Sequence, residues 1–98
     1  MDISDWRKKI DEIDRSLLKL LNERARCVVE IGRIKRQDGL PIHEPSREQE
    51  VVRQALEANQ GPLASDAIRR IFERIVEEGR ALQQRLFPAE EKQEERKP

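Results

Sequence analysis

The sequence has few of the side chains from which reactive protein sites are usually built. Its 98 residues include one cysteine (Cys27), one histidine (His43) and no tyrosine. A single cysteine forms no internal disulfide and is typical of a reducing compartment, so we expect a cytoplasmic protein. One cysteine and one histidine are too few for a zinc site and a poor basis for a nucleophilic pair. We therefore expect no bound metal.

Net charge and long apolar runs are also absent. Lysine and arginine together number 20, as do aspartate and glutamate, and both signs are mixed along the chain. This balance argues against a general nucleic-acid binder, which needs a basic surface. No apolar run approaches the roughly 20 residues of a membrane span. Residues 1–6 lack the basic and apolar regions of a signal peptide. We expect neither nucleic acid nor a membrane as a partner.

What the sequence does contain is helical periodicity. Hydrophobic residues make up 36% of the chain and charged residues 41%, which gives a single small domain a thin core. One set of mostly apolar residues recurs every three or four positions, which is the period of a helix, so these residues share one helix face. The set consists of Ile3, Trp6, Ile10, Ile13, Leu17, Leu20, Arg24, Cys27, Ile31 and Ile34. A helix of about 32 residues within the range 4–37 would be about 48 Å long. It must therefore extend past its own chain's core and pack against something else.

Helix-breaking residues divide the rest of the chain. Ser4 or Asp5 is the expected N-cap of the long helix, and Gly39 and Pro41 end it. The pair at 61–62, glycine then proline, marks a second turn. The chain is thus predicted to be all-α, with one long helix followed by two shorter ones.

The two later helices and the tail have their own signals. We expect a short helix over about residues 45–59, with Ser46 and Gln49 as a capping box. A medium helix starts at position 65 or 66 and reaches about position 87. Residues 88–98 are charged and have no apolar content to bury, so we expect a disordered tail. The helical domain therefore covers residues 1–87.

Two cations lie on the apolar face of the long helix. Arg24 and Lys35 are eleven residues apart, so they share a face about 16 Å apart along the axis. Val28 and Ile31 lie between them as an apolar floor. A buried guanidinium is costly unless it is paired or meets an anion. The pattern favours a small dianion clamped by both cations; the alternative is that both side chains reach solvent along the helix.

Gly79 and Gln83 interrupt the apolar stripe of the third expected helix, one turn apart. Glycine inside a helix costs about 1 kcal/mol relative to alanine, so Gly79 indicates a close approach by another group. Gln83 would then line a pocket and donate a hydrogen bond. The alternative is a helix-crossing contact at Gly79 with an exposed Gln83 at the rim.

Charged residues also cluster at the start of the second helix. Glu48 suits a helix N-terminus electrostatically, but Arg47 does not, and Glu44 is placed to pair with a cation. A solvated charge cluster is the alternative. Arg7 lies 28 residues before Lys35, about 42 Å along the axis. Arg7 and Lys35 therefore share a pocket only if Arg7 comes from a second chain.

An ordered set of short motifs spans about residues 5–86. The motifs are WRKKIDEID (6–14), LLKLLNER (17–24), IGRIK (31–35), GLPI (39–42), PSREQE (45–50), GPL (61–63), AI (67–68), RIF (70–72) and LQ (82–83). Together they resemble the all-α chorismate mutases, the AroQ class. No single motif is specific, but their order, the helix lengths and both loops agree with that family.

The resemblance implies a fold and an assembly. The family has three helices per chain, long, short and medium, in an intertwined helical homodimer whose long helices cross both subunits. Each active site takes one arginine from the partner's first helix, and Arg7 matches that position. The implied reaction is the rearrangement of chorismate to prephenate in phenylalanine and tyrosine biosynthesis, without a cofactor. The implied partners are the small-molecule substrate and a second copy of the chain.

The resemblance also implies a set of site residues. The predicted substrate-binding residues are Arg7, Arg24, Lys35, Glu44, Arg47, Glu48, Gly79 and Gln83. Arg24, Lys35 and Arg47 match the family's cationic ligands. Gln83 matches the donor to the ether oxygen, and Lys35, Gln83 and Arg24 form the predicted catalytic set.

Three of these positions carry the family's finer features. Glu44 and Glu48 stand where the family binds the region of the substrate hydroxyl. Gly79 is a departure, because the family commonly has a serine there that meets a substrate carboxylate. Glycine keeps the backbone N–H but loses the hydroxyl, for which we expect a loss of about 0.5–1.5 kcal/mol rather than inactivity.

Three other functions are compatible with parts of the pattern. Isochorismate pyruvate lyase is an enzyme on the same fold, but the segment over residues 41–50 favours the mutase. A non-catalytic helical regulatory dimer would keep the fold without the chemistry, and Gly79 is its best support. A plain coiled-coil linker leaves residues 39–41 and Gln83 unexplained.

Overall fold

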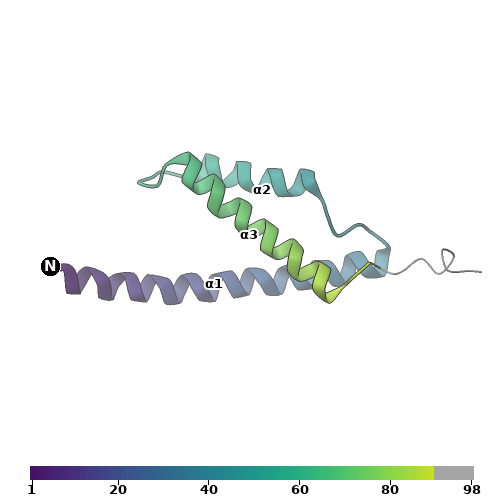
Figure 1. Ribbon diagram of the computed structural model, residues 1–98, viewed down its shortest axis with the longest axis horizontal. Coiled ribbons are helices and arrows are strands. Elements are labelled where there is room, and N and C mark those ends of the chain that lie inside the picture. Colours follow the sequence, from purple (N-terminus) through teal and green to yellow (C-terminus); the bar gives the residue numbers. More distant parts are fainter. Residues whose placement is uncertain (90–98) are drawn as a thin grey trace, which may run out of the picture.

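The computed structural model describes residues 1–89, which form three α-helices. They are α1 (Ile3–Asp38), α2 (Pro45–Ala58) and α3 (Ser65–Leu86), arranged as Figure 1 shows. No strand is present within residues 1–89, which confirms the predicted all-α class with a long, a short and a medium helix. The predicted disordered tail lies outside the described residues from position 90 onward.

The two ends of α1 are capped in different ways. Asp2 is the N-cap: its side chain accepts a hydrogen bond from the Asp5 N–H, and the Asp5 carboxylate accepts one from the Asp2 N–H. The prediction of Ser4 or Asp5 as the N-cap is therefore wrong, because this reciprocal capping box places Asp5 three residues inside the cap. At the other end, Gly39 adopts a left-handed φ of 68°, which confirms it as the predicted helix terminator.

α2 begins at Pro45, a position where a missing backbone N–H costs nothing. Its N-cap is Glu44, whose side chain makes no capping hydrogen bond. The predicted capping box of Ser46 and Gln49 is wrong, since Ser46 already lies inside the helix. After α2 the chain turns where Gly61 has a φ of 79°, at the predicted break.

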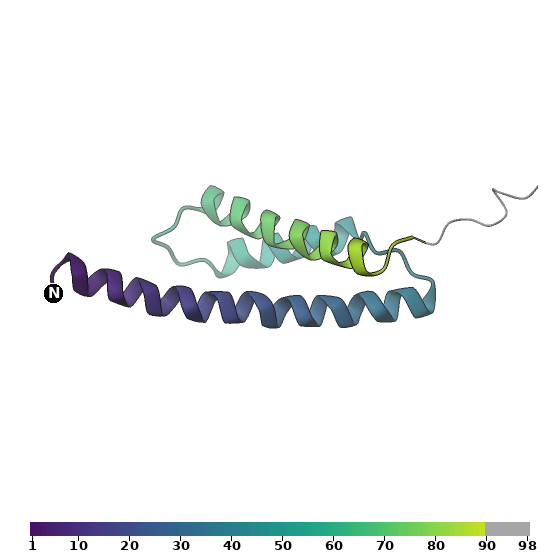
Figure 2. The ribbon, with the colours of Figure 1, turned by 60° about the horizontal axis from the view of Figure 1, so that its bottom comes forward.

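α3 packs against both α1 and α2 (Figures 1 and 2). Between α2 and α3 lie Val52 and Val76, the two buried apolar side chains of residues 1–89. Near the end of α3 the chain crosses α1 at Gly32, where an added Cβ would lie only 2.8 Å from the Phe87 ring. A side chain at Gly32 would therefore push this crossing apart. The core within one chain is small, as the composition predicts.

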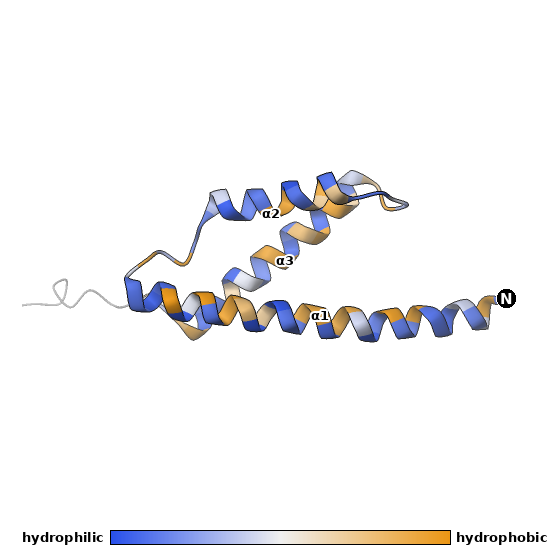
Figure 3. Cartoon of the chain, turned by 180° about the vertical axis from the view of Figure 1, so that it is seen from behind, coloured by the Kyte–Doolittle hydropathy of each residue, from blue (hydrophilic) through white to orange (hydrophobic). Residues whose placement is uncertain are grey.

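The N-terminal half of α1 extends past the other two helices (Figure 2). Its apolar residues recur at intervals along the helix, as the orange segments of α1 in Figure 3 show. Each of these residues is at least 53% exposed: Ile3, Trp6, Ile10, Ile13, Leu17 and Leu20. A continuous exposed apolar stripe marks an interaction face, unlike scattered single residues. None of the helices in residues 1–89 is long and apolar enough to cross a membrane.

Candidate active site

A cavity of about 260 Å³ lies where the C-terminal halves of α1 and α3 meet the start of α2. Seven of the eight predicted substrate-binding residues line it, namely Arg24, Lys35, Glu44, Arg47, Glu48, Gly79 and Gln83. The other lining residues are Val28, Ile31, Ile42, Val51, Val76 and Arg80. Residues far apart in the sequence thus line one cavity, and Arg7 is the one predicted residue that does not line it.

Arg24 and Lys35 line the cavity from the same face of α1. Val28 and Ile31 lie between them on that wall, so the predicted apolar floor is confirmed. α3 approaches this face at Gly79, where an added Cβ would lie 3.6 Å from both the Arg24 guanidinium and the Val28 methyl groups. Arg24 makes no ion pair within residues 1–89. It is therefore a cation whose charge is not balanced by the chain around it.

Lys35 is the most buried cation of the site, with 9% of its surface exposed. Its Nζ donates a hydrogen bond to the Ile42 carbonyl at 3.0 Å and pairs with Glu44 Oε1 at 2.5 Å. The hydrogen bond and the charge of Lys35 lower the pKa of the Glu44 carboxyl below its ordinary value, with a smaller contribution from Arg47. Glu44 is thus a carboxylate at neutral pH, and it fixes the ammonium at the cavity wall.

Gln83 is buried, with 6% of its surface exposed, so the alternative of a rim-exposed side chain is wrong. Its Nε2 donates a 2.7 Å hydrogen bond to the Val28 carbonyl of α1. This bond fixes the amide in the wall between α1 and α3. An amide nitrogen carries two N–H groups, so one donor remains for a ligand.

The start of α2 brings two charged residues to the opposite wall. Arg47 pairs with Glu50 Oε1 at 2.6 Å, one helical turn away, and both side chains are exposed. Glu48 instead points toward α3, where its Oε1 lies 2.6 Å from Arg80 Nη1. Arg80 was not among the predicted site residues. Its spacing of four from Val76 and three from Gln83 is the signal that places it on the same face of α3.

This ordered set of polar residues around one cavity has a counterpart among known proteins. Residues 6–84 match the family model for chorismate mutase type II. The chain belongs to this family.

Relatives of the family occur both as separate enzymes and as parts of larger ones. A chorismate mutase of Methanocaldococcus jannaschii is 34% identical over 86 residues, which cover 87% of each chain. A bifunctional chorismate mutase/prephenate dehydratase of Aquifex aeolicus is 36% identical over 89 residues, or 87% of this chain. The present chain spans only 25% of that bifunctional relative's length.

Solved structures agree with this assignment. Chorismate mutase from Thermus thermophilus, in its form II structure, is 38% identical and superposes with a TM-score of 0.83. The superposition covers 85% of this chain and 94% of that one. At this identity and coverage the three-helix fold of the present chain is that of the chorismate mutase family.

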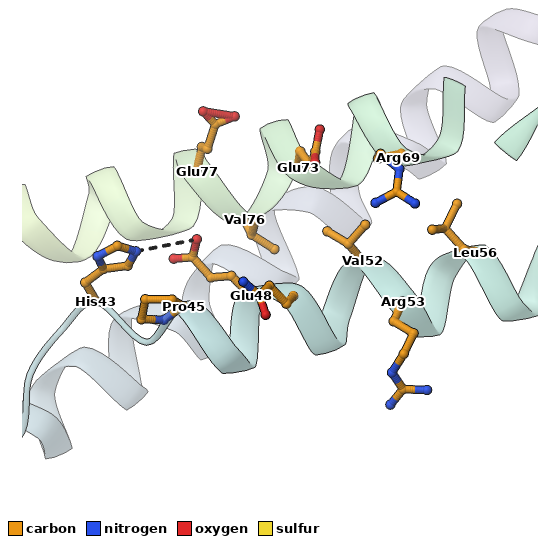
Figure 4. A pocket seen from close by; sticks show the side chains of 11 residues that line it. His43, Pro45, Glu48, Val52, Arg53, Leu56, Arg69, Glu73, Val76 and Glu77 are labelled. Atoms are coloured by element: carbon orange, nitrogen blue, oxygen red, sulfur yellow. Dashed lines mark ion pairs between the residues drawn. The ribbon is translucent and has the colours of Figure 1, made fainter. Parts of the chain in front are cut away.

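A second, larger cavity of about 620 Å³ lies between α2 and α3 (Figure 4). Across it, Val52 on α2 and Val76 on α3 point toward one another. Its charged lining comprises Glu48, Arg53, Arg69, Glu73 and Glu77, an excess of one negative charge. The smaller cavity is lined by four cations and two carboxylates, an excess of two positive charges. The smaller cavity is therefore the candidate active site despite its size, because only its net positive lining suits an anion.

Arg7 lies in the uncovered half of α1, far from this cavity. It precedes Lys35 by 28 residues in one unbroken helix, a separation of about 42 Å. The Arg7 and Lys35 of one chain therefore do not share a site. Within residues 1–89, no group of three or more histidine, cysteine or acidic residues is arranged to hold a metal ion.

Proposed function

We propose that this chain is an isomerase that converts chorismate to prephenate in phenylalanine and tyrosine biosynthesis. The observation that carries the proposal is the smaller cavity, where seven predicted residues meet and where the whole lining, Arg80 included, has an excess of two positive charges. Chorismate carries two carboxylates, so its charge is complementary to this lining. The single cysteine is unpaired, in keeping with a cytoplasmic location.

The reaction requires only that the protein bind the substrate in the reactive conformation and complement its charge. Within one molecule the ether C–O bond breaks while a C–C bond forms, so no atom is gained or lost. No nucleophile, metal or cofactor is required. The protein must hold the flexible dianion in its compact, chair-like shape, which removes much of the entropic part of the barrier. Arginine suits this task because its fork binds a carboxylate with two parallel hydrogen bonds.

The cavity residues divide into two groups by role. Arg24 and Arg47 bind the substrate carboxylates, together with Arg7 of a second chain. As the C–O bond breaks, the ether oxygen gains negative charge, and Lys35 and Gln83 stabilise that charge more in the transition state than in the ground state. The burial of both side chains supports this role, since a water-poor wall strengthens their electrostatic effect.

The two carboxylates of the cavity serve the neutral part of the substrate. Glu44 and Glu48 accept hydrogen bonds from the region of the substrate hydroxyl. Each is already paired with a cation, Glu44 with Lys35 and Glu48 with Arg80. Their negative charge is therefore compensated, and they do not repel the bound dianion.

The working unit is a homodimer in which the long helices cross. The uncovered stripe of α1 supports this assembly, because a second copy would remove its apolar side chains from water. The same arrangement brings Arg7 of one chain to the cavity of the other. Size-exclusion chromatography with light scattering should give the dimer mass. Leu17→Glu, which places a charge on the exposed stripe, should give monomers and sharply reduced turnover.

The test of the activity is the loss of chorismate absorbance with purified protein, with the product identified by chromatography. Prephenate as product is the expected result. Pyruvate from isochorismate, without turnover of chorismate, would indicate the lyase instead. A folded dimer that neither turns over chorismate nor binds a bicyclic transition-state mimic would be a non-catalytic regulatory scaffold, and the proposal would fail.

A further inference from the structure

Arg80 is a charged residue of the cavity wall whose role the function proposed above leaves open. It lies on α3, and its Nη1 donates to Glu48 Oε1 on α2 at 2.6 Å. The pair thus links the two helices that form one side of the site. Glu48 lines both this cavity and the larger one between α2 and α3, so its carboxylate stands at the partition between them.

The Arg80–Glu48 pair differs from the other arginine–carboxylate pairs of residues 1–89. Those pairs join residues three or four apart on one helix, and their side chains are 45–75% exposed. Arg80 and Glu48 are 27% and 22% exposed and belong to different helices. Exposed pairs of the first kind contribute little to stability or geometry. A partly buried pair between two elements instead restrains both side chains.

His43 holds Arg80 from a second side. Its Nε2 lies 3.2 Å from the same Arg80 Nη1. A guanidinium has no acceptor, so the imidazole nitrogen must accept the hydrogen bond. Both side-chain hydrogen bonds of Arg80 within residues 1–89 are thus made by the same nitrogen, Nη1. The loop before α2, α2 itself and α3 meet at that atom.

We propose that Arg80 is a positioning residue, which holds the Glu48 carboxylate at the wall of the cavity for the substrate. The proposal rests on the function proposed above, in which Glu48 accepts a hydrogen bond from the hydroxyl region of the substrate. A glutamate side chain has several rotatable bonds, and fixing it at the moment of binding costs conformational entropy. Arg80 already restrains the Glu48 side chain before the substrate binds, so less conformational entropy is lost on binding.

A double-mutant cycle between Arg80 and Glu48 tests this role. Arg80→Ala should lower kcat/KM about 10-fold, the effect expected for one hydrogen bond to a charged group, mainly through KM. In the Glu48→Ala background, Arg80→Ala should cause no further loss, because the group that it positions is gone. Additive losses would overturn the proposal, since Arg80 would then act without Glu48. Arg80→Lys should restore most of the activity, because one donor nitrogen makes both contacts.

Arg70→Ala is the matched control. Arg70 lies on the same helix and pairs with Asp66 at 3.5 Å, but its side chain is 69% exposed and it lines neither cavity. This variant should keep wild-type kcat and KM. If Arg80→Ala fails to fold, Arg80→Met takes its place in the cycle, because it keeps a long side chain but has no N–H donor. A wild-type KM for Arg80→Met alongside a raised KM for Glu48→Ala would overturn the positioning role.

The same cycle measured by thermal unfolding of the ligand-free protein reports on the contact alone. A shift in melting temperature that is non-additive between the two substitutions is the expected result, and strict additivity would show that the pair does not form. A failure of the proposed function and a failure of the Arg80 role would give different results. Absence of chorismate turnover by the wild-type chain would overturn the proposed function. Normal turnover with an additive kinetic cycle would overturn the role of Arg80 alone.

Discussion

The two halves of α1 have the same apolar period but different surroundings. Every residue from 1 to 23 is exposed, whereas the C-terminal half packs against α3 and buries Gly32 and Lys35. Periodicity therefore shows that a face is to be buried, but not which chain will bury it. The packed half contributes Arg24 and Lys35 to the cavity, and the uncovered half contains Arg7. In the homodimer proposed above, the uncovered half of one chain completes the site of the other.

The strongest test of the packed half is Lys35→Ala. Removing a buried donor to a developing oxyanion typically costs about 10²–10³-fold in turnover, and we expect a loss of kcat of at least that size. The exposed stripe is untouched, so the protein should stay folded and dimeric. Initial rates with chorismate and the mass in solution check both statements. Near wild-type turnover would contradict the role of Lys35 at the ether oxygen.

The two halves can be tested together by mixing two inactive variants. In a hybrid dimer of Arg7→Ala with Lys35→Ala, one of the two sites has both wild-type residues, and the other has neither. Random pairing after co-refolding gives half hybrids, so activity should recover to about a quarter of wild type. Each variant refolded alone is the control. If hybrids are confirmed by mass and activity does not recover, then Arg7 and Lys35 do not act across the interface.

The sequence predicted the fold well because its signals are local. Helical periodicity, the break at Gly39 and the turn at Gly61 need only near neighbours in the chain, and all three helices agree with expectation. The errors lie at the N-termini of α1 and α2. Asp2 rather than Ser4 caps α1, and Ser46 lies inside α2 because Pro45 already occupies the first helical position. Several polar residues in a row fit a cap, and only backbone geometry selects one.

The site was predictable where a polar residue interrupts an apolar stripe. Arg24, Lys35 and Gln83 were found in this way, Glu44 and Glu48 were noted as part of a charge cluster, and the family resemblance gave those two their expected role. Arg80 was left out of the predicted site residues, although its spacing from Val76 and Gln83 places it on the same face of α3. An arginine at such a position usually reaches solvent. Its partner Glu48 comes from another helix, 32 residues away, and a contact of that kind leaves no local pattern.

Gly79→Ser tests the contact between α3 and the packed half of α1. The added Cβ would lie 3.6 Å from Arg24 and Val28, an ordinary van der Waals distance, so the helix should accept it. A new hydroxyl at the cavity wall should tighten substrate binding by about 0.5–1.5 kcal/mol, seen as a lower KM. Circular dichroism and melting temperature serve as the folding control. Collapse of the fold would show instead that Gly79 is needed for packing.

The smallest expected effect concerns pH, at the Lys35–Glu44 pair where α1 meets the start of α2. Because Lys35 lowers the pKa of Glu44, the carboxylate contributes stability that is fully present above the unfolded value, near 4.5, and is lost as pH falls through the folded value. The pair should therefore stay intact throughout the neutral range. Gln83 is an amide and needs no proton, so turnover should vary little there.

Profiles of kcat and melting temperature against pH, for wild type and Glu44→Gln, test this expectation. The pH profiles of the two proteins should differ in shape only on the acid side of pH 4.5, where Glu44 of the wild type becomes protonated. Turnover that rises steeply toward acid pH, and is low at neutral pH, would contradict the assignment. The donor to the ether oxygen would then be a protonated acid rather than Gln83. The packed half of α1 would still supply the charge of the site, but the buried amide on α3 would not complete it.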